Sequence, residues 1–180
     1  MRDQSDKILG VERRNLILSW LRSSAHPLTG QSLASRTGVS RQVIVQDVSL
    51  LKAGGHPIIA TARGYVYLPD QAQMARQKRT IAVSHKPEDT AKELYILIDY
   101  GVMVENVTVE HPIYGDLTGS LMLRNRHDVN AFLEKVKTTK ANLLLDLTEG
   151  VHMHTLEADT EEQLDQAVEA LGKAGFLLES

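Results

Sequence analysis

The sequence predicts an α+β fold in two domains, a winged helix-turn-helix at the N-terminus followed by an α/β sandwich. Near the N-terminus, two short helical patterns meet at a glycine and precede a β-hairpin pattern. From residue 79 onward, strand patterns alternate with three helical ones. The charge also changes between the two parts, which favours two domains over one.

The first expected helix covers residues 10–23. Its apolar residues Ile17, Trp20 and Leu21 recur at helical spacing, and three arginines lie on its polar side. We expect it to support the helix pair that follows, with Trp20 packed against that pair.

Residues 28–51, LTGQSLASRTGVSRQVIVQDVSLL, predict two short helices joined by a tight turn. Thr29 and Ser40 are suitable N-caps, and an apolar residue precedes each cap and recurs at the fourth helical position as a hydrophobic staple. Gly38 can adopt the positive φ with which helices commonly end. This pattern is typical of a DNA-reading helix-turn-helix.

The second helix of the pair has two different faces. Ile44, Val48 and Leu51 form a packing face, and the opposite face presents Gln42, Val45, Gln46 and Ser49. Gln pairs with an adenine edge, a Val methyl contacts a thymine methyl, and Arg41 at the helix start reaches phosphate. The alternative is a plain packing unit with a solvated polar face. We favour DNA binding because of the spacing, the staples and the hairpin that follows.

After Gly54 and Gly55, two β-rich runs cover residues 58–61 and 65–68. The Ala62-Arg63-Gly64 link predicts a hairpin, and three helices followed by a hairpin predict a winged helix. Arg63 at the tip of the wing is a candidate phosphate contact, or otherwise an ordinary solvated turn residue.

The domain boundary is predicted in the polar stretch PDQAQMARQK. We assign residues 1–69 to the winged helix, 70–78 to a linker and 79–180 to the second domain. The chain has 20 Lys and Arg residues, of which 10 lie in residues 1–77 and 10 in residues 78–180. Of its 23 Asp and Glu residues, 5 lie in the first part and 18 in the second. The net charge is thus +5 before the boundary and −8 after it. A basic N-terminal part and an acidic remainder fit a nucleic-acid module joined to a domain that does not touch DNA.

The second domain is predicted as a sheet with helices on one side. Pro87 opens a helix that buries Ala91, Leu94, Tyr95 and Ile98 and ends near Gly101, and Asp159 caps the last helix. A further helix covers 125–137, and the apolar run 142–147 fits either a helix or a strand. The strands are expected at 79–84, 102–109, 117–123, 150–158 and 176–179.

Histidines and one glutamate suggest a metal site in this domain. His152 and His154 lie two apart in a predicted strand, so both project from one face. Buried imidazoles need polar partners, which a cation would supply. His85 ends the first strand and Glu93 lies in the next helix; this set suits Ni, Zn, Fe or Mn. Chance placement is the alternative. His111, at a strand end, is either a ligand-loop residue or an ordinary turn residue.

The composition excludes several classes of protein. With no Cys, disulfides and thiolate metal sites are absent. No apolar run approaches the roughly 20 residues of a membrane span, and MRDQSDK lacks the apolar core of a signal peptide. We therefore expect a soluble, cytoplasmic protein with no membrane partner.

The winged-helix pattern, followed in order by SHKPEDTAKEL, VEHPIYGDLTGSL and GVHMHTLEA, resembles the niacin-responsive transcription repressors of bacteria. These proteins combine a winged helix with a three-histidine regulatory domain, and the resemblance covers nearly the whole chain. It implies a repressor of genes for NAD synthesis or niacin uptake that binds a divalent metal and nicotinic acid and acts as a homodimer on palindromic operator DNA. It would assign the metal to His85, Glu93, His152 and His154, and the effector to His111 and Tyr114.

Two other functions are compatible with the residues. One is a metal-dependent enzyme with an accessory winged helix, because His and Glu around a metal also activate water. We find no acid/base pair or nucleophile motif beyond the expected metal ligands, so we do not expect an enzyme. The other is a two-domain regulator that senses a different small molecule without a metal.

Overall fold

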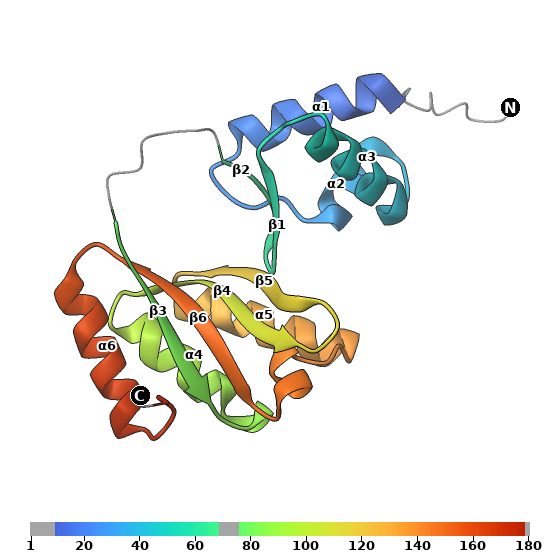
Figure 1. The fold of residues 1–180 in the computed structure, drawn as a ribbon. Helices are drawn as coiled ribbons and strands as arrows, with labels where there is room; N and C mark the ends of the chain where they lie inside the picture. The colour runs from blue at the N-terminus through green and yellow to red at the C-terminus, as the bar shows by residue number, and fades with distance from the viewer. Residues whose placement is uncertain (1–9, 69–75, 179–180) are drawn as a thin grey trace, which may run out of the picture. The chain divides into compact units, whose positions relative to one another are not determined.

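The computed structural model describes residues 10–68 and 76–178 of the chain. These residues form two compact units, an N-terminal unit (10–68) and a C-terminal unit (76–178), each with its own core (Figure 1). Positions 70–75 of the predicted linker lie outside the described residues. Gln77 and Lys78, also assigned to that linker, belong instead to strand β3 (Gln77–Ser84), because they pair with the neighbouring strand β6 (Val151–Ala158).

The N-terminal unit is a winged helix-turn-helix, as predicted. It consists of three helices and an antiparallel hairpin, α1 (Gly10–Ser23), α2 (Gly30–Thr37), α3 (Arg41–Ala53), β1 (Ile58–Thr61) and β2 (Gly64–Tyr67). Ile17, Leu33 and Ile44, one from each helix, are fully buried in its core, and Trp20 packs at the edge of that core.

The helix caps expected in the N-terminal unit are all present. The Thr29 Oγ1 atom accepts a hydrogen bond from the Ser32 N–H at 3.0 Å, and the Ser40 Oγ atom accepts one from the Val43 N–H at 3.4 Å. Gly38 has a φ of 66° and ends α2. Because these caps are local, they fix where α2 and α3 begin without help from the rest of the fold.

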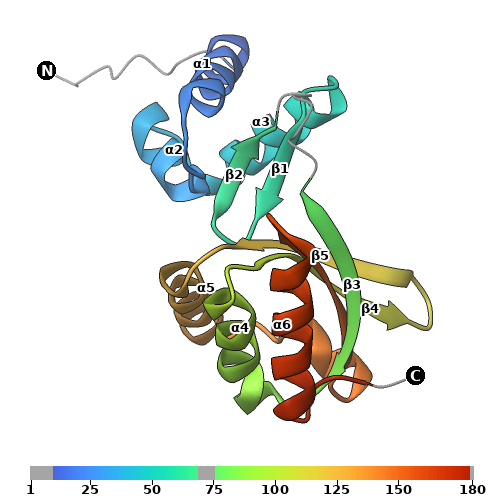
Figure 2. The same cartoon turned by 90° about the vertical axis from the view of Figure 1, so that its left-hand side faces the viewer.

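The C-terminal unit is a four-stranded antiparallel sheet with the strand order β3-β6-β4-β5. Figure 2 shows helices α4, α5 and α6 on one face of this sheet. Apart from β3 and β6, its elements are η1 (Pro87–Asp89), α4 (Thr90–Asp99), β4 (Met103–His111), β5 (Gly115–Leu123), α5 (Arg126–Thr139), η2 (Leu144–Thr148) and α6 (Glu161–Lys173).

The first helix of this unit differs from the prediction in its buried face. Leu94 and Ile98 are buried as expected, but Ala91 and Tyr95 are partly exposed. Thr90, Glu93 and Leu97 are buried in their place. A polar threonine and a glutamate therefore face the sheet, which an apolar-periodicity argument does not anticipate.

The other differences are confined to the ends of elements. Thr160, not Asp159, caps α6, and its Oγ1 atom accepts a hydrogen bond from the Gln163 N–H at 3.3 Å. The ambiguous run 142–147 forms the short 3₁₀ helix η2. The expected last strand is reduced to an isolated bridge between Leu177 and Val83.

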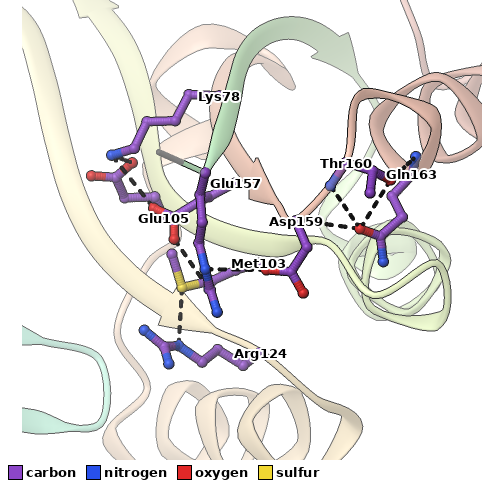
Figure 3. A network of polar contacts seen from close by, with 9 residues as sticks. Lys78, Met103, Glu105, Arg124, Glu157, Asp159, Thr160 and Gln163 are labelled. Carbon is purple, nitrogen blue, oxygen red and sulfur yellow. Dashed lines mark hydrogen bonds and ion pairs between the residues drawn. The ribbon is translucent and has the colours of Figure 1, made fainter. Parts of the chain in front are cut away.

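A charged cluster, which we call the β3 anchor, lies where the chain enters β3 (Figure 3). Glu157 on β6 is only 5% exposed. Its carboxylate lies 3.2 Å from Arg76 Nη1 and 3.5 Å from Lys78 Nζ, and Lys78 also contacts Glu105 at 2.8 Å. The acidic contacts raise the pKa of Lys78, chiefly through the hydrogen bond to Glu105. A buried carboxylate is tolerated here because two cations are paired with it.

Within residues 10–68 and 76–178, no helix is both long and apolar enough to cross a membrane.

Candidate metal centre

Four side chains from three separate segments converge between the sheet and α4. His85 directly follows β3, Glu93 lies in α4, and His152 and His154 lie on β6. The two β6 histidines point to the same face, as their spacing predicted, and each is at most 3% exposed. Val83 and Ile81 pair with them on β3. His85 and Glu93 are 8% and 1% exposed, so the whole set is buried.

The Glu93 carboxylate lies at the centre of this set. Its Oε2 atom is 2.8 Å from His85 Nε2, and its Oε1 atom is 3.3 Å from His154 Nε2 and 3.6 Å from His152 Nε2. The coordinating atoms of His85, Glu93 and His152 all lie within 4.8 Å of one another. The structure therefore brings together all four residues predicted as metal ligands.

Each imidazole is held by a backbone carbonyl through its other nitrogen. The Nδ1 atoms of His85, His152 and His154 lie 2.8, 2.9 and 2.7 Å from carbonyl oxygens of Lys86, Gly150 and Asn106. A carbonyl oxygen only accepts, so each Nδ1 carries the proton. In the neutral rings the Nε2 lone pairs then all face Glu93, an arrangement typical of metal-bound histidines.

The pKa shifts follow from this arrangement. Burial would raise the pKa of Glu93, but the three histidines around its carboxylate, above all His154, hold that pKa well below its usual value. Burial would lower the pKa of His85, but the hydrogen bonds to Glu93 and to the Lys86 carbonyl raise it overall. When His85 is protonated, its Nε2 atom can donate a hydrogen bond to Glu93 Oε2 across the 2.8 Å between them.

The donor atoms fit a divalent transition metal. Glu93 Oε1 and His154 Nε2 are buried and have no hydrogen-bond partner among the described residues. Leaving buried polar atoms unpaired costs about 1–3 kcal/mol each. A cation would satisfy both atoms at once, and three imidazoles with one carboxylate suit Zn, Ni, Fe or Mn.

Gly150 has a structural role in this centre that the sequence analysis did not identify. Its carbonyl oxygen accepts hydrogen bonds from the His85 N–H and from His152 Nδ1, which ties two of the ligands together. Its φ is 99°, and a Cβ at this position would lie 2.4 Å from the His85 carbonyl oxygen. Only glycine fits both requirements. A glycine next to a predicted ligand strand was the available signal.

His111 and Tyr114, the residues predicted to bind the effector, do not join the metal centre. They lie at the turn between β4 and β5, where His111 Nδ1 accepts from the Ile113 and Tyr114 N–H groups. Tyr114 is 72% exposed. Neither residue lines the small cavity beside the metal ligands. His111 is held in the turn by these local hydrogen bonds, and the effector role of His111 and Tyr114 stays a prediction.

The predicted DNA-reading residues lie on the outer side of α3 and at the wing. Ile44, Val48 and Leu51 are buried, as expected for the packing face. The Ser49 hydroxyl donates to the Val45 carbonyl at 2.8 Å. Arg63 lies in the hairpin turn and is half-buried. Val45 is half-buried, and the exposed residues are Arg41, Gln42, Gln46 and Ser49.

Asp47 is a buried charge on α3 that the sequence analysis overlooked. It is 2% exposed, and its Oδ2 atom lies 2.6 Å from Arg13 Nε. Arg14 Nη1 lies 3.4 Å from its Oδ1 atom. Two of the three arginines on the polar side of α1 are therefore used to fix α3, and their positive charge is partly neutralised there.

A winged helix with an exposed reading face, together with a buried set of metal donors in a second unit, defines a two-domain DNA-binding protein. Comparisons with known proteins agree with this class. Residues 13–66 match the family model described as an HTH domain, and residues 78–180 match that of the 3H domain.

Two relatives cover nearly the whole chain. The chain is 50% identical over 173 residues to the "Transcription repressor NadR" of Bacillus subtilis (strain 168), with 96% of each protein covered. It is 38% identical over 173 residues to the "Probable transcription repressor NiaR" of Thermotoga maritima, with 96% of this chain and 97% of the relative covered. The chain belongs to the family of the transcription repressors NadR and NiaR.

Proposed function

We propose that this chain represses genes of NAD biosynthesis or niacin uptake and that nicotinic acid controls its binding to DNA through a divalent metal. The convergence of His85, Glu93, His152 and His154 in a domain joined to a winged helix carries the proposal. The names of the two relatives, both transcription repressors, support the DNA-binding part.

The four side chains would hold the metal through His Nε2 atoms and the Glu93 carboxylate. Their Nδ1 hydrogen bonds to backbone carbonyls keep the rings oriented and raise their basicity. A bound metal supplies an open coordination position for the carboxylate or ring nitrogen of nicotinic acid. The protein itself excludes water, because all four side chains are buried.

On DNA, the exposed face of α3 would read the major groove and Arg63 would contact the backbone. We further propose a homodimer on a palindromic operator, with the two α3 helices about 34 Å apart, one turn of DNA. Nicotinic acid changes repression only if it binds the DNA-competent state with a different affinity from other states.

The test is an operator-binding assay with and without nicotinic acid, repeated after chelation, on the wild type and two variants. Gln46→Ala removes a predicted base contact, so it should weaken operator binding about tenfold and leave the metal content intact. His152→Ala should lose metal and the response to nicotinic acid but keep nonspecific DNA affinity.

The outcomes separate the competing functions. If elemental analysis finds no metal in purified protein and chelation changes nothing, a metal-free sensor of another small molecule replaces this proposal. Conversion of nicotinic acid or nicotinamide by the pure protein would instead establish a metal-dependent enzyme.

A further inference from the structure

A small cavity of about 30 Å³ lies directly beside the metal centre. Glu93, His152 and His154 form one end of it. Seven apolar side chains form most of the remaining wall, among them Leu121, Phe132 and Leu144. A cavity of this size holds a water molecule or two, and its apolar wall gives such water few partners.

Thr90 contributes the remaining polar side chain of the cavity lining. It begins α4 one turn before Glu93, so the two side chains share a helix face. Thr90 is 6% exposed, and its Oγ1 atom has no hydrogen-bond partner within the described residues. Buried threonine hydroxyls in helices commonly donate to a carbonyl one turn earlier, so an unpaired one facing a cavity requires explanation.

The lining of this cavity combines polar groups at the metal donors and at Thr90 with apolar side chains between them, which would suit a ligand with two polar ends and an apolar body. One end would lie at the metal donors, and the body would pack among the aliphatic side chains. The second polar end would be costly to bury in this wall unless it found a donor. Among the lining side chains outside the metal set, only the Thr90 hydroxyl can donate a hydrogen bond.

The wall on the solvent side is the one through which such a ligand would enter. Phe132, Leu143 and Leu144 are partly exposed, whereas Leu94 and Leu145 on the inner side are buried. Leu143 and Leu144 lie in the segment that ends in η2, a helix of only five residues. An aromatic ring exceeds the volume of the closed cavity, so binding must displace these outer side chains.

We propose that this cavity is the effector subsite and that the Thr90 hydroxyl is the hydrogen-bond donor that selects a small aromatic carboxylate with a second polar atom in its ring. This inference rests on the proposed function, because it places nicotinic acid in that cavity. If the carboxylate faces the metal centre, Thr90 pairs with the ring nitrogen; in the opposite orientation, Thr90 pairs with the carboxylate.

The test is calorimetric binding of nicotinic acid and of benzoic acid, which lacks the ring nitrogen, to the metal-loaded full chain. Thr90→Val keeps the shape of the side chain and removes the hydroxyl, so the affinity for nicotinic acid should fall about tenfold or more. Thr90→Ser should restore most of it. Thr80→Val, an exposed threonine on β3, is the matched control and should bind like the wild type.

The benzoic acid arm identifies the end of the ligand that Thr90 contacts. A loss confined to nicotinic acid places the hydroxyl at the ring nitrogen, and a loss for both ligands places it at the carboxylate. If Thr90→Val binds nicotinic acid as tightly as the wild type, the role of Thr90 is refuted, but the proposed function is not. The same holds if elemental analysis shows that this variant has lost its metal. A metal-loaded wild type that fails to bind nicotinic acid would instead refute the proposed function.

Discussion

The protonation of the three imidazoles follows from one repeated contact, a backbone carbonyl at each Nδ1 atom. Because the Nδ1 proton is fixed, Nε2 carries either a lone pair for a metal or a second proton toward Glu93. A cation bound by these atoms would compete with protons, so its occupancy would depend on pH.

We expect opposite pH trends in metal-free and metal-loaded protein. The raised pKa of His85 stabilises the metal-free fold below its ordinary value of 6.5, and this contribution is lost as the pH rises through the raised value. The lowered pKa of Glu93 contributes to the stability of the fold above the ordinary value of 4.5, and this contribution is lost as the pH falls through the lowered value.

After chelation, the melting temperature should thus decrease as the pH rises above about 6.5, where His85 loses its proton in the unfolded chain but still holds it in the fold. Metal affinity should increase over the same range, because protons compete less for Nε2. Melting curves and metal titrations at a series of pH values check both trends. A metal affinity that does not change with pH would show that the imidazoles are not the ligands.

At the residue scale, the sequence predicted those features that depend on local spacing. The two-residue alternation placed His152 and His154 on one face, and Thr29 and Ser40 were identified as caps because a cap acts on a neighbouring N–H. Asp47 and Thr90 were not identified, since their importance depends on Arg13 and on a cavity contributed by distant segments. The effector assignment of His111 came from the family resemblance, and its local hydrogen bonds in the turn could not be read from the spacing.

Among the elements, the turn into β6 positions the metal centre most directly. Gly150→Ala would force a Cβ into the His85 carbonyl and place alanine at a φ of 99°. We expect this variant to be destabilised by more than about 1 kcal/mol and to bind metal at least tenfold more weakly. Gly175→Ala is a control for the positive φ alone, because a Cβ there has open space at a φ of 77°. Equal metal affinity in both variants would contradict this role of Gly150.

Helix α3 depends on α1 through a buried ion pair. Asp47→Ala would leave Arg13, whose side chain is 12% exposed, without its main partner. Because breaking a buried pair leaves an uncompensated charge, we expect the N-terminal unit to lose about 3 kcal/mol. Chemical denaturation measures this loss, and Lys173→Ala, which removes an exposed pair with Glu169, is a control expected to have little effect on stability. A similar small cost for both variants would show that Asp47 does not support α3.

Most helices and strands could be predicted from hydrophobic periodicity, but their ends could not always be. The predicted range of α1 is the observed one, and the apolar residues Ile17 and Leu21, which recur at helical spacing, are buried in it. The buried face of α4 was misplaced since it carries Glu93 and Thr90, which serve the site instead of the core. Apolar periodicity predicts which apolar side chains are buried, and buried polar side chains at a functional site interrupt that periodicity.

In the whole molecule, linkage makes the coupling between the two units measurable from either side. If nicotinic acid tightens operator binding by some factor, operator DNA must tighten nicotinic acid binding by the same factor. We expect the two factors, measured by DNA titration and by calorimetry with and without operator, to agree within error. Coupling is expected to disappear after chelation. Factors that differ reproducibly would show that the ligand and the DNA do not share one equilibrium.

Strands β3 and β6 are joined by eight consecutive residue pairs, from Gln77 and Ala158 to Ser84 and Val151 (Figure 1). A slip of one residue in this register would turn both β6 imidazoles away from α4. We therefore expect the two strands to move together as one rigid unit. One end of this pair of strands carries His152 and His154, and at the other end Glu157 forms an ion pair with Arg76. Any tilt of these strands that draws the imidazoles closer to Glu93 would therefore also move Glu157 and the Arg76 side chain that is paired with it.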